Sequence, residues 1–296
     1  MKQFFKWLGR TLCLAMAAIL VYIGLAFFGN PVSWTIAKIN TSRYMEQNFG
    51  DSHFQVSKVG YNFKTGGYYA FIDSPTSQDS YFTIEFDGWG RYRYDTYENV
   101  TDGSNTLRRI DLDYSKLVDS KLQNGVSPFD TSIVIGELRP ADLIEVYSYT
   151  DENDNTIVYS IDKEYGLDRS TLELDKEYNI QQLGSVAGSI TLYIHDPEVT
   201  VERAAELLLD VKEYLDSSGV PFYAMDLVLC EPRNVEGQLT GVEIRLYDFL
   251  YNDIYEDGLI QRVQQSWDLA QEHHAIQDGL KKEMEIIDTV LEEINP

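Results

Sequence analysis

Cysteine and histidine are scarce in this chain of 296 residues, which contains two and four of them respectively. Cys13 lies in an apolar run near the N-terminus, so Cys230 is the one cysteine in the rest of the chain. An intramolecular disulfide framework, the usual staple of small secreted domains, is therefore excluded. The histidines show no H-E-x-x-H or related ligand spacing, and the sequence predicts no metal site and no cofactor.

Basic residues are also few, because 24 Lys and Arg stand against 48 Asp and Glu, for a formal net charge of −24. Nucleic-acid binding depends on Lys and Arg that neutralise phosphates, so nucleic acid is excluded as a partner. Cationic partners or metal ions remain compatible with this charge, although such a charge more often serves solubility. The sequence does not define an oligomeric state.

Catalytic signatures are missing as well. The chain has no G-x-S-x-G, no S-x-x-K, no P-loop and no dinucleotide-binding fingerprint. With 48 acids, two carboxylates will lie within glycosidase distance by chance alone, so this chemistry stays an alternative without positive support. We expect a protein that is not an enzyme.

A long apolar run is present near the N-terminus. Residues 11–29 carry no charge, and about 19 apolar residues form about 28 Å of helix, close to the hydrocarbon thickness of a bilayer. The preceding tail holds Lys2, Lys6 and Arg10, which predicts a cytoplasmic N-terminus and extracytoplasmic domains after a single pass through the plasma membrane. A cleaved signal peptide is the rival interpretation, but the small residues Gly24 and Ala26 lie inside the run, which favours an uncleaved anchor.

A first α+β domain is predicted over residues 30–124. Asn30 and Pro31 form a helix start, and Val32, Ile36, Ile39 and Met45 recur at helical spacing, as in an amphipathic helix that leaves the membrane surface. Four strands in an antiparallel meander follow up to residue 97, and a helix over residues 107–122 is expected to close this domain.

Aromatic residues concentrate around the last of these strands. Trp89, Tyr92, Tyr94 and Tyr97 surround Arg91 and Arg93, and exposed rings at such spacing suit stacking on a sugar or contact with a peptide. Packing of a half-buried sheet explains the same rings without a ligand. The four residues are the candidate binding face.

A second α+β domain is predicted over residues 128–252. Strands are expected at 131–138 and on both sides of a turn at 151–155, where Asp151, Asn153 and Asn155 match the first ligand positions of a calcium loop and Asp162 the twelfth. Thr156 replaces the required glycine, so a hairpin turn is the favoured interpretation.

The rest of this domain combines a strand at 188–195, a helix that begins at Thr200 and ends near Gly219, and two further strands. We interpret strand, helix and returning strand as a split β-α-β element. Residues 253–296 are predicted to be a helical segment with one break near Gly279.

Two stretches carry a resemblance to a known family. The first is GNPVSWTIAKINTSRYMEQNFG with VSKVGYNFKTGGYYAFIDSPTSQDSYFTIEF, and the second is LDKEYNIQQLGSVAGSITLYIHDPEVTVERAAELL. The chain resembles the YfjL-like membrane proteins of Gram-positive bacteria over most of the sequence after the anchor. The resemblance implies location and architecture, and no catalytic residue belongs to its motifs. The first domain also looks like the cystatin or PepSY shape, a likeness that does not transfer function.

The sequence therefore predicts a membrane-anchored extracytoplasmic protein that binds an envelope protein or peptide. Two alternatives remain. A cystatin-like or PepSY-like inhibitory or sensing module should show an exposed hydrophobic wedge. A hydrolase of envelope polymers should show an exposed carboxylate pair beside Trp89 or the tyrosines.

Overall fold

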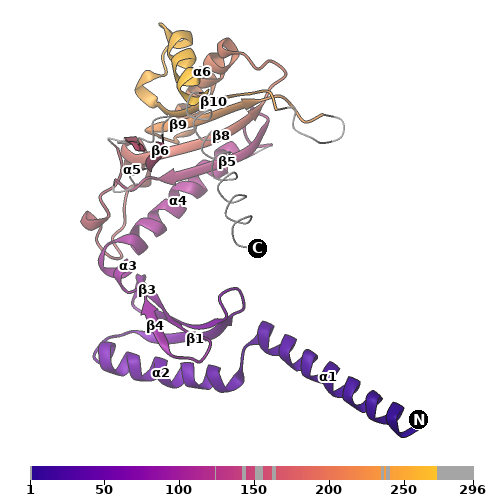
Figure 1. The fold of residues 1–296 in the computed structure, drawn as a ribbon. Helices are drawn as coiled ribbons and strands as arrows, with labels where there is room; N and C mark the ends of the chain where they lie inside the picture. Colours follow the sequence, from indigo (N-terminus) through magenta and orange to yellow (C-terminus); the bar gives the residue numbers. More distant parts are fainter. Residues whose placement is uncertain are drawn as a thin grey trace. The chain divides into compact units, whose positions relative to one another are not determined.

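The computed structural model describes residues 2–123, 125–141, 145–150, 156–161, 165–234, 237 and 241–271. The protein is α+β, as predicted, with two four-stranded sheets in two compact units (Figure 1). Unit 1 contains residues 1–106 and 172–176, and unit 2 contains residues 107–171 and 177–296. The turn at 151–155, whose hairpin interpretation was favoured over a calcium loop, and the predicted helix beyond residue 271 lie outside the described residues.

Helix α1 (Lys2–Phe28) covers the apolar run. It is long and apolar enough to cross a membrane, and a signal sequence would meet the same description. Gly29 follows with a φ of 77°, and a Cβ there would lie 2.7 Å from the ring of Tyr61. Glycine is required at this joint because both the dihedral angle and the space exclude a side chain.

Helix α2 (Pro31–Phe49) begins as predicted, since the side chain of Asn30 accepts a hydrogen bond from the Val32 amide and Pro31 occupies the first turn. Of the predicted apolar residues, Met45 packs against the core, but the first half of the helix buries a different face. Ser33, Ala37 and Thr41 are buried, whereas Val32, Ile36 and Ile39 are exposed. Small residues are needed on the buried face because the backbone at Gly90 lies directly against Ser33 and Ala37.

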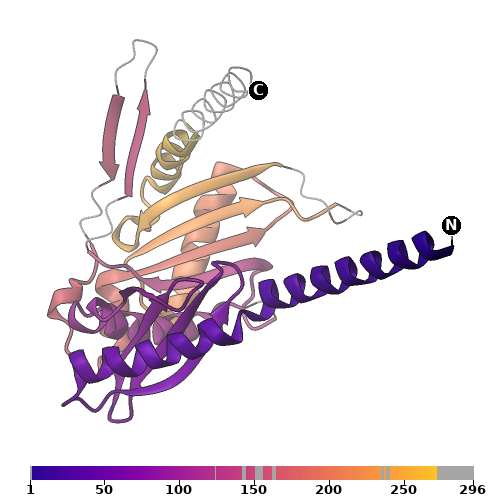
Figure 2. The same cartoon turned by 60° about the horizontal axis from the view of Figure 1, so that its bottom comes forward.

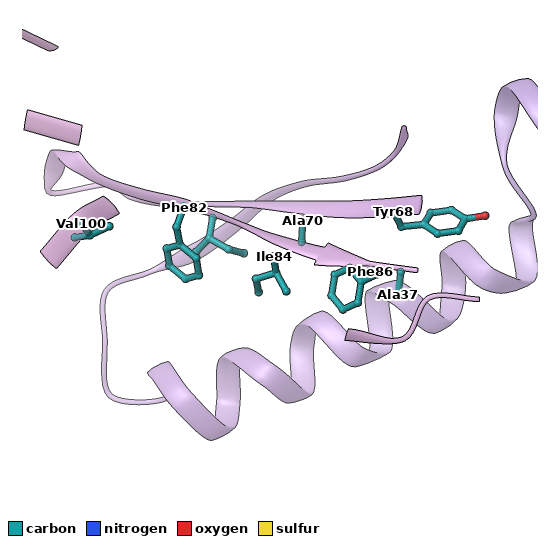
Figure 3. Close-up of a cluster of buried hydrophobic side chains, with 8 residues drawn as sticks. Ala37, Tyr68, Ala70, Phe82, Ile84, Phe86 and Val100 are labelled. Atoms are coloured by element: carbon teal, nitrogen blue, oxygen red, sulfur yellow. The ribbon is translucent and has the colours of Figure 1, made fainter. Parts of the chain in front are cut away.

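The sheet of unit 1 is an antiparallel meander in the order β1-β2-β3-β4. Its strands are β1 (Gln55–Asn62), β2 (Gly67–Ser74), β3 (Ser77–Phe86) and β4 (Tyr92–Asp95). Helix α2 lies along one face, and the core between them is built from a few large rings and aliphatic side chains (Figure 3). The core residues are Ala37, Tyr68, Ala70, Ile72, Phe82, Ile84, Phe86 and Val100.

The chain leaves unit 1 through the short helix α3 (Glu98–Thr101) and helix α4 (Ser104–Leu122). The predicted first domain contained all of α4, but from Leu107 onwards the helix belongs to unit 2. There the Tyr114 hydroxyl donates a hydrogen bond to the Pro221 carbonyl (2.9 Å), and the Leu138 amide donates one to Asp111 (2.6 Å). An amphipathic pattern shows that one face is buried, but it does not show against which sheet.

A segment from the second half of the chain, residues 172–176, returns to unit 1. Asp175 has a φ of 59°, and its amide donates a hydrogen bond to the buried Asp79 carboxylate (2.9 Å). The Asp175 carboxylate accepts hydrogen bonds from the amides of Gln78 and Asp79. These reciprocal bonds hold the segment at the start of β3.

Unit 2 is built on a mixed sheet in the order β10-β9-β8-β5. Its strands are β5 (Thr131–Leu138), β8 (Gly188–His195), β9 (Ala224–Cys230) and β10 (Glu243–Leu250). Strands β8 and β9 are parallel, hydrogen-bonded neighbours, so the predicted β-α-β element is present but is not split by an intervening strand. Helix α6 (Val201–Ser218) connects them across one face of the sheet (Figure 2).

The ends of α6 follow local sequence rules. The Thr200 hydroxyl accepts a hydrogen bond from the Arg203 amide, and Gly219 ends the helix with a φ of 70°. The remaining elements are the hairpin β6 (Glu145–Thr150) and β7 (Thr156–Ile161), helix α5 (Ile180–Ala187), the short turns η1 (Arg169–Thr171) and η2 (Tyr251–Asp253), and a helix over residues 259–271.

Candidate functional site

The four residues of the predicted binding face do not share one surface. Tyr97 packs into the core of unit 1, where its ring lies 4.8 Å from that of Phe49 and 5.3 Å from that of Phe82. It cannot stack on a ligand while it fills this position. The spacing of the tyrosines gave no sign of this difference, because Tyr97 lies beyond the end of β4.

Tyr92 faces helix α2. Its ring stacks on that of Tyr44 at 5.0 Å, and both hydroxyls donate hydrogen bonds to the same Asp95 oxygen, at 2.9 Å and 2.5 Å. Burial disfavours the charged form of Asp95, but the bonds from Tyr44, the Tyr97 amide and Tyr92 outweigh it and lower the pKa of this carboxyl. Tyr92 thus joins β4 to α2.

Tyr94 lies on the opposite face of the sheet because β4 contains a bulge. Tyr92 pairs with Phe86 and Tyr94 pairs with Glu85, so two residues along β4 correspond to one along β3. Adjacent residues of a strand point to opposite faces, and Phe86 is in the core. The bulge at Arg93 therefore turns Tyr94 outward, away from α2.

Tyr94 belongs to a larger aromatic surface that we call the outer aromatic face. Tyr69 pairs with Glu85, Phe71 pairs with Thr83, and Tyr81 alternates with the core residue Phe82, which gives all of them the same side. The members of the outer aromatic face are Tyr69, Phe71, Tyr81 and Tyr94. Phe71 is 37% exposed and Tyr94 is 53% exposed. Alternation along β3 indicated this side for Tyr81, but pairing was needed to bring the four rings together.

Charged side chains of both signs accompany these rings. The ammonium of Lys58 lies 5.9 Å from the ring centre of Tyr69, and Lys58 pairs with Phe71. Glu85 lies between Tyr69 and Tyr94 in the register. Burial raises the pKa of Glu85, and the nearby Arg93 partly offsets this rise. The outer aromatic face can therefore offer stacking, a cation and a carboxylate to a ligand.

Trp89 occupies a fourth environment, the tip of the turn between β3 and β4. The Asp87 carboxylate organises this tip by accepting hydrogen bonds from the amides of Trp89 (2.9 Å) and Arg91 (2.8 Å) and from the Arg91 guanidinium (3.1 Å). These bonds outweigh the effect of burial and lower the pKa of Asp87. The indole ring itself is exposed.

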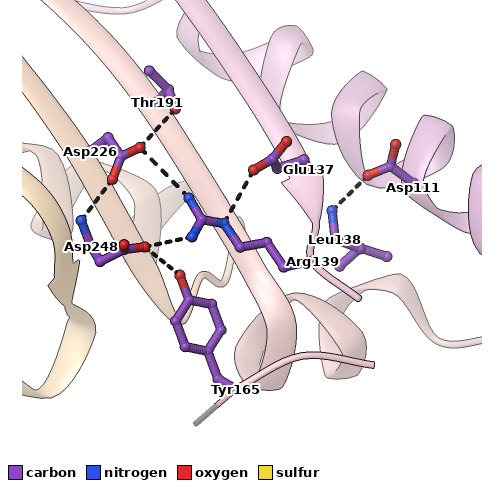
Figure 4. A network of polar contacts seen from close by, with 8 residues as sticks. All are labelled: Asp111, Glu137, Leu138, Arg139, Tyr165, Thr191, Asp226 and Asp248. Atoms are coloured by element: carbon purple, nitrogen blue, oxygen red, sulfur yellow. Dashed lines mark hydrogen bonds and ion pairs between the residues drawn. The ribbon is translucent and has the colours of Figure 1, made fainter. Parts of the chain in front are cut away.

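Unit 2 contains a polar network around Arg139, which sequence reasoning did not identify (Figure 4). Its guanidinium contacts Asp248 (2.6 Å), Glu137 (3.2 Å) and Asp226 (3.7 Å). The Tyr165 hydroxyl donates a hydrogen bond to Asp248 (2.7 Å). Burial opposes the charged form of Arg139, but the surrounding acids, Asp248 first, raise its pKa.

The network stabilises an irregular stretch of β10. Asp248 has a φ of 48° and lies in a bulge between Leu246 and Phe249. Its amide donates a hydrogen bond to Asp226 (2.7 Å), so both its backbone and its side chain are held. A non-glycine residue keeps such a dihedral angle only where its surroundings fix it. We interpret the network as structural, since its polar atoms bond to one another.

Cys230 and His195 form the pair most similar to a nucleophile with a base. They end the neighbouring strands β9 and β8, and the sulfur lies 3.3 Å from Nδ1 of His195. The thiol also reaches the Ile194 carbonyl at 3.5 Å. Burial, with a further contribution from Glu243, raises the pKa of Cys230. A reactive cysteine needs a lowered pKa, so this environment favours the inert thiol.

One groove on unit 2 has a volume of about 520 Å³. It runs along the outer face of α6, beside Pro128 and Phe129, and its lining includes Asp210, Glu213 and Tyr214. The rings of Phe129 and Tyr214 meet edge to face at 5.7 Å. The lining combines the cation of Arg203 with two acids and two aromatic rings, but nothing in its geometry selects a ligand.

The family was identified by comparison with family models. The YfjL-like N-terminal domain model matches residues 4–96, and the YfjL-like C-terminal domain model matches residues 113–264. The gap between the two matches contains α3 and the start of α4, where the chain passes from unit 1 to unit 2. Searches of curated proteins and of solved structures found no match. The chain belongs to the YfjL-like family.

Proposed function

We propose that this protein is a membrane-anchored extracytoplasmic binding protein that recognises a protein or peptide partner through the outer aromatic face. Helix α1 is the anchor, with its basic N-terminal tail in the cytoplasm and both units outside. In this proposal the protein carries out no chemistry.

The outer aromatic face is the observation that carries the proposal. Helix α2 covers one side of the unit 1 sheet, and on the other side Phe71 and Tyr94 remain exposed beside Lys58 and Glu85. Tyrosine and phenylalanine are enriched in protein interfaces, where they bury much area at a low cost in side-chain entropy. A cation and a carboxylate within the same surface add specificity of orientation.

Hydrolysis by a carboxylate pair is less well supported. The carboxylates near Trp89 and Tyr92 are Asp87 and Asp95, and both are occupied by hydrogen bonds and have lowered pKa values. A general acid needs the opposite shift. Glu85 has a raised pKa, as a general acid requires. Its paired residues on the neighbouring strands are Tyr69 and Tyr94, so the strand pairing supplies aromatic rings and not a second carboxylate.

The inhibitory alternative has one supporting feature, an apolar wedge at one end of unit 1. Phe63 in the β1–β2 turn and Trp89 in the β3–β4 turn are both exposed. The two turns lie side by side, since a Cβ at Gly88 would be 2.9 Å from the Gly66 carbonyl oxygen. A soluble target would have to approach them beside the end of α1.

A site-specific photocrosslinker tests the proposed face. We would introduce it in place of Phe71 in the full-length protein and, as a control, in place of the exposed Leu112 of α4. We expect a defined crosslinked species at position 71 that is lost with Tyr94→Ser and Tyr69→Ser and is not formed at position 112. Equal crosslinking at both positions would contradict recognition by this face.

The anchor is tested separately. A reporter active only outside the cytoplasm would be fused after Pro296, and an immunoblot would follow the length of the chain. We expect activity together with a full-length band in the membrane fraction. An inactive reporter would reverse the orientation, and a shortened soluble band would make α1 a signal sequence.

A further inference from the structure

A second group of exposed apolar residues in unit 1 lies at the end where α1 joins it. We name this group the membrane-end patch and define it as Phe28, Val32, Ile36, Phe63 and Trp89. They come from the end of α1, the first two turns of α2 and the two hairpin turns. Phe63 is 57% exposed and Trp89 is 66% exposed, which are large fractions for such rings.

Contacts within unit 1 bring these segments to one end. The rings of Phe27 and Phe63 lie 6.1 Å apart, and the Tyr61 hydroxyl donates a hydrogen bond to the Ala26 carbonyl (3.1 Å). The end of α1 therefore touches the β1–β2 hairpin. The β3–β4 turn lies beside that hairpin at Gly66 and Gly88.

The start of α2 is fixed at the same place. The Tyr68 hydroxyl accepts a hydrogen bond from the Asn30 amide (2.6 Å) and donates one to the Asn30 carbonyl (2.8 Å). Further along α2, the Asn40 side chain donates a hydrogen bond to the Gly90 carbonyl (2.8 Å). These bonds set Ile36 next to the β3–β4 turn, with a Cβ at Gly90 only 3.2 Å from Cβ of Ile36. Val32 lies one turn before Ile36 in the same helix.

We propose that the membrane-end patch rests on the phospholipid bilayer, with Phe63 and Trp89 at the boundary between headgroups and acyl chains. The proposal rests on the membrane anchor of the proposed function. Helix α2 begins at Pro31, three residues after α1 ends at Phe28, so the chain keeps Val32 within about 14 Å of the end of the apolar run. A surface held that close to a bilayer meets lipid before any soluble partner.

The chemistry of the patch suits this position. Tryptophan and other aromatic rings are enriched at membrane interfaces, and cationic side chains next to them reach the phosphates. Lys64 follows Phe63 in one turn and Arg91 follows Trp89 by two residues in the other. Both side chains are exposed, and the Arg91 guanidinium also contacts Asp87 (3.1 Å).

The distribution of charged residues also favours contact between unit 1 and the bilayer. Residues 30–106 carry 6 Lys and Arg against 9 Asp and Glu, whereas residues 107–296 carry 15 against 39. An anionic bilayer surface would repel the second region far more strongly than the first. The nearly neutral region is the one joined to α1.

The four tryptophans of the chain allow a direct test. Trp7 lies in α1, Trp89 in the patch and Trp267 in unit 2, so single-tryptophan variants can be made by Trp→Phe replacement at the other positions. Each full-length variant would be reconstituted into vesicles whose phospholipids carry bromine at defined acyl positions. Bromine quenches only an indole that reaches the acyl region.

We expect strong quenching of Trp7 and Trp89 and an unchanged emission of Trp267. A matched control is Tyr94→Trp in a background without the natural tryptophans, because this position is exposed on the same unit but on the outer aromatic face. It should remain unquenched. Circular dichroism would verify that every variant is folded.

The outcomes separate the two proposals. Quenching of Trp7 without quenching of Trp89 would overturn the membrane-end patch and leave its wedge free for a protein partner, while the anchor would stand. Absence of quenching at Trp7 would overturn the anchor, and the bilayer contact with it. Equal quenching of Trp89 and the Tyr94→Trp control would show adsorption of the whole unit and would also overturn the specific patch.

Discussion

Units 1 and 2 both cover a four-stranded sheet with helices, but they use different side chains and different charge. The unit 1 core depends on rings such as Tyr68, Phe82 and Phe86, and its sheet is an antiparallel meander. The unit 2 core is mostly aliphatic, as in Ile190, Leu192 and Leu227 on the parallel strands β8 and β9. The unit 2 sheet is mixed, with one parallel pair between two antiparallel ones.

The two sheets also differ in the side chains that accompany their exposed and polar positions. In unit 1 the alternating meander places Phe71 and Tyr94 outward, next to charged residues. In unit 2 the polar network in the sheet consists of Arg139 and the acids Glu137, Asp226 and Asp248, which bind one another. Unit 1 therefore presents aromatic and charged side chains on an exposed face, whereas the charged side chains of this network in unit 2 are used for internal contacts.

The largest expected effect is the loss of stability when a buried side chain is truncated in the core of either unit. Phe82→Ala should cost unit 1 about 3–5 kcal/mol, and Leu208→Ala should cost unit 2 about 2–5 kcal/mol, since both side chains are buried. Denaturant unfolding would be followed in variants that retain only Trp34, for unit 1, or only Trp267, for unit 2. We expect each truncation to shift only the reporter of its own unit. Shifts of both reporters by either truncation would show that the units unfold as one.

A smaller effect is expected at the polar network of unit 2. Arg139→Met removes the guanidinium that contacts Asp226 and Asp248 in a largely buried place, at a cost of about 2–3 kcal/mol. Lys116→Met, which removes an exposed pair with Asp113, is the matched control and should cost less than about 0.5 kcal/mol. Urea unfolding gives both values. Similar losses for the two variants would refute a structural role of the network.

In unit 1 the stability contributed by Asp95, which joins β4 to α2, should depend on pH. The pKa of Asp95 is lowered, so its stabilisation is present above the unfolded pKa and is lost as the pH falls through the folded one. Asp95→Asn should cost about 1 kcal/mol at pH 7, because the carboxylate is partly exposed. The difference from the natural protein should vanish in strong acid. A cost that is independent of pH would point to packing instead.

The smallest effect has the opposite sign and concerns the outer aromatic face. The pKa of Glu85 is raised by burial, so the folded protein loses stability as the pH rises through the unfolded and then the folded pKa. Glu85→Gln should raise the melting temperature slightly at pH 7 and leave it unchanged near pH 4. A lower melting temperature at pH 7 would mean that Glu85 makes a stabilising ion pair.

Much of the local structure was predictable because its signals are local. The cap at Asn30, the cap at Thr200 and the end of α6 at Gly219 are all where the sequence predicts them. The four strands of unit 1 and the hairpin β6–β7 are confirmed for the same reason, since alternation and turn residues act within a few positions.

The candidate site was predictable only in part. The sequence predicted one binding face from four aromatic residues, but the structure distributes Trp89, Tyr92, Tyr94 and Tyr97 over a turn, the α2 side, the outer side and the core. The bulge at Arg93 is responsible for separating Tyr92 from Tyr94. A bulge depends on the pairing of two strands, so one strand's sequence does not reveal it.

The sequence by itself determined the apolar N-terminal helix, the positions of most helices and strands, and the concentration of acidic residues after residue 106. Tertiary structure decided that α4 joins unit 2, that α2 buries Ser33 and Ala37 instead of Val32 and Ile36, and that Tyr94 faces outward. The physical reason is that propensity and periodicity act along the chain. The partner of an apolar face is chosen by shape and close approach between segments that are distant in sequence.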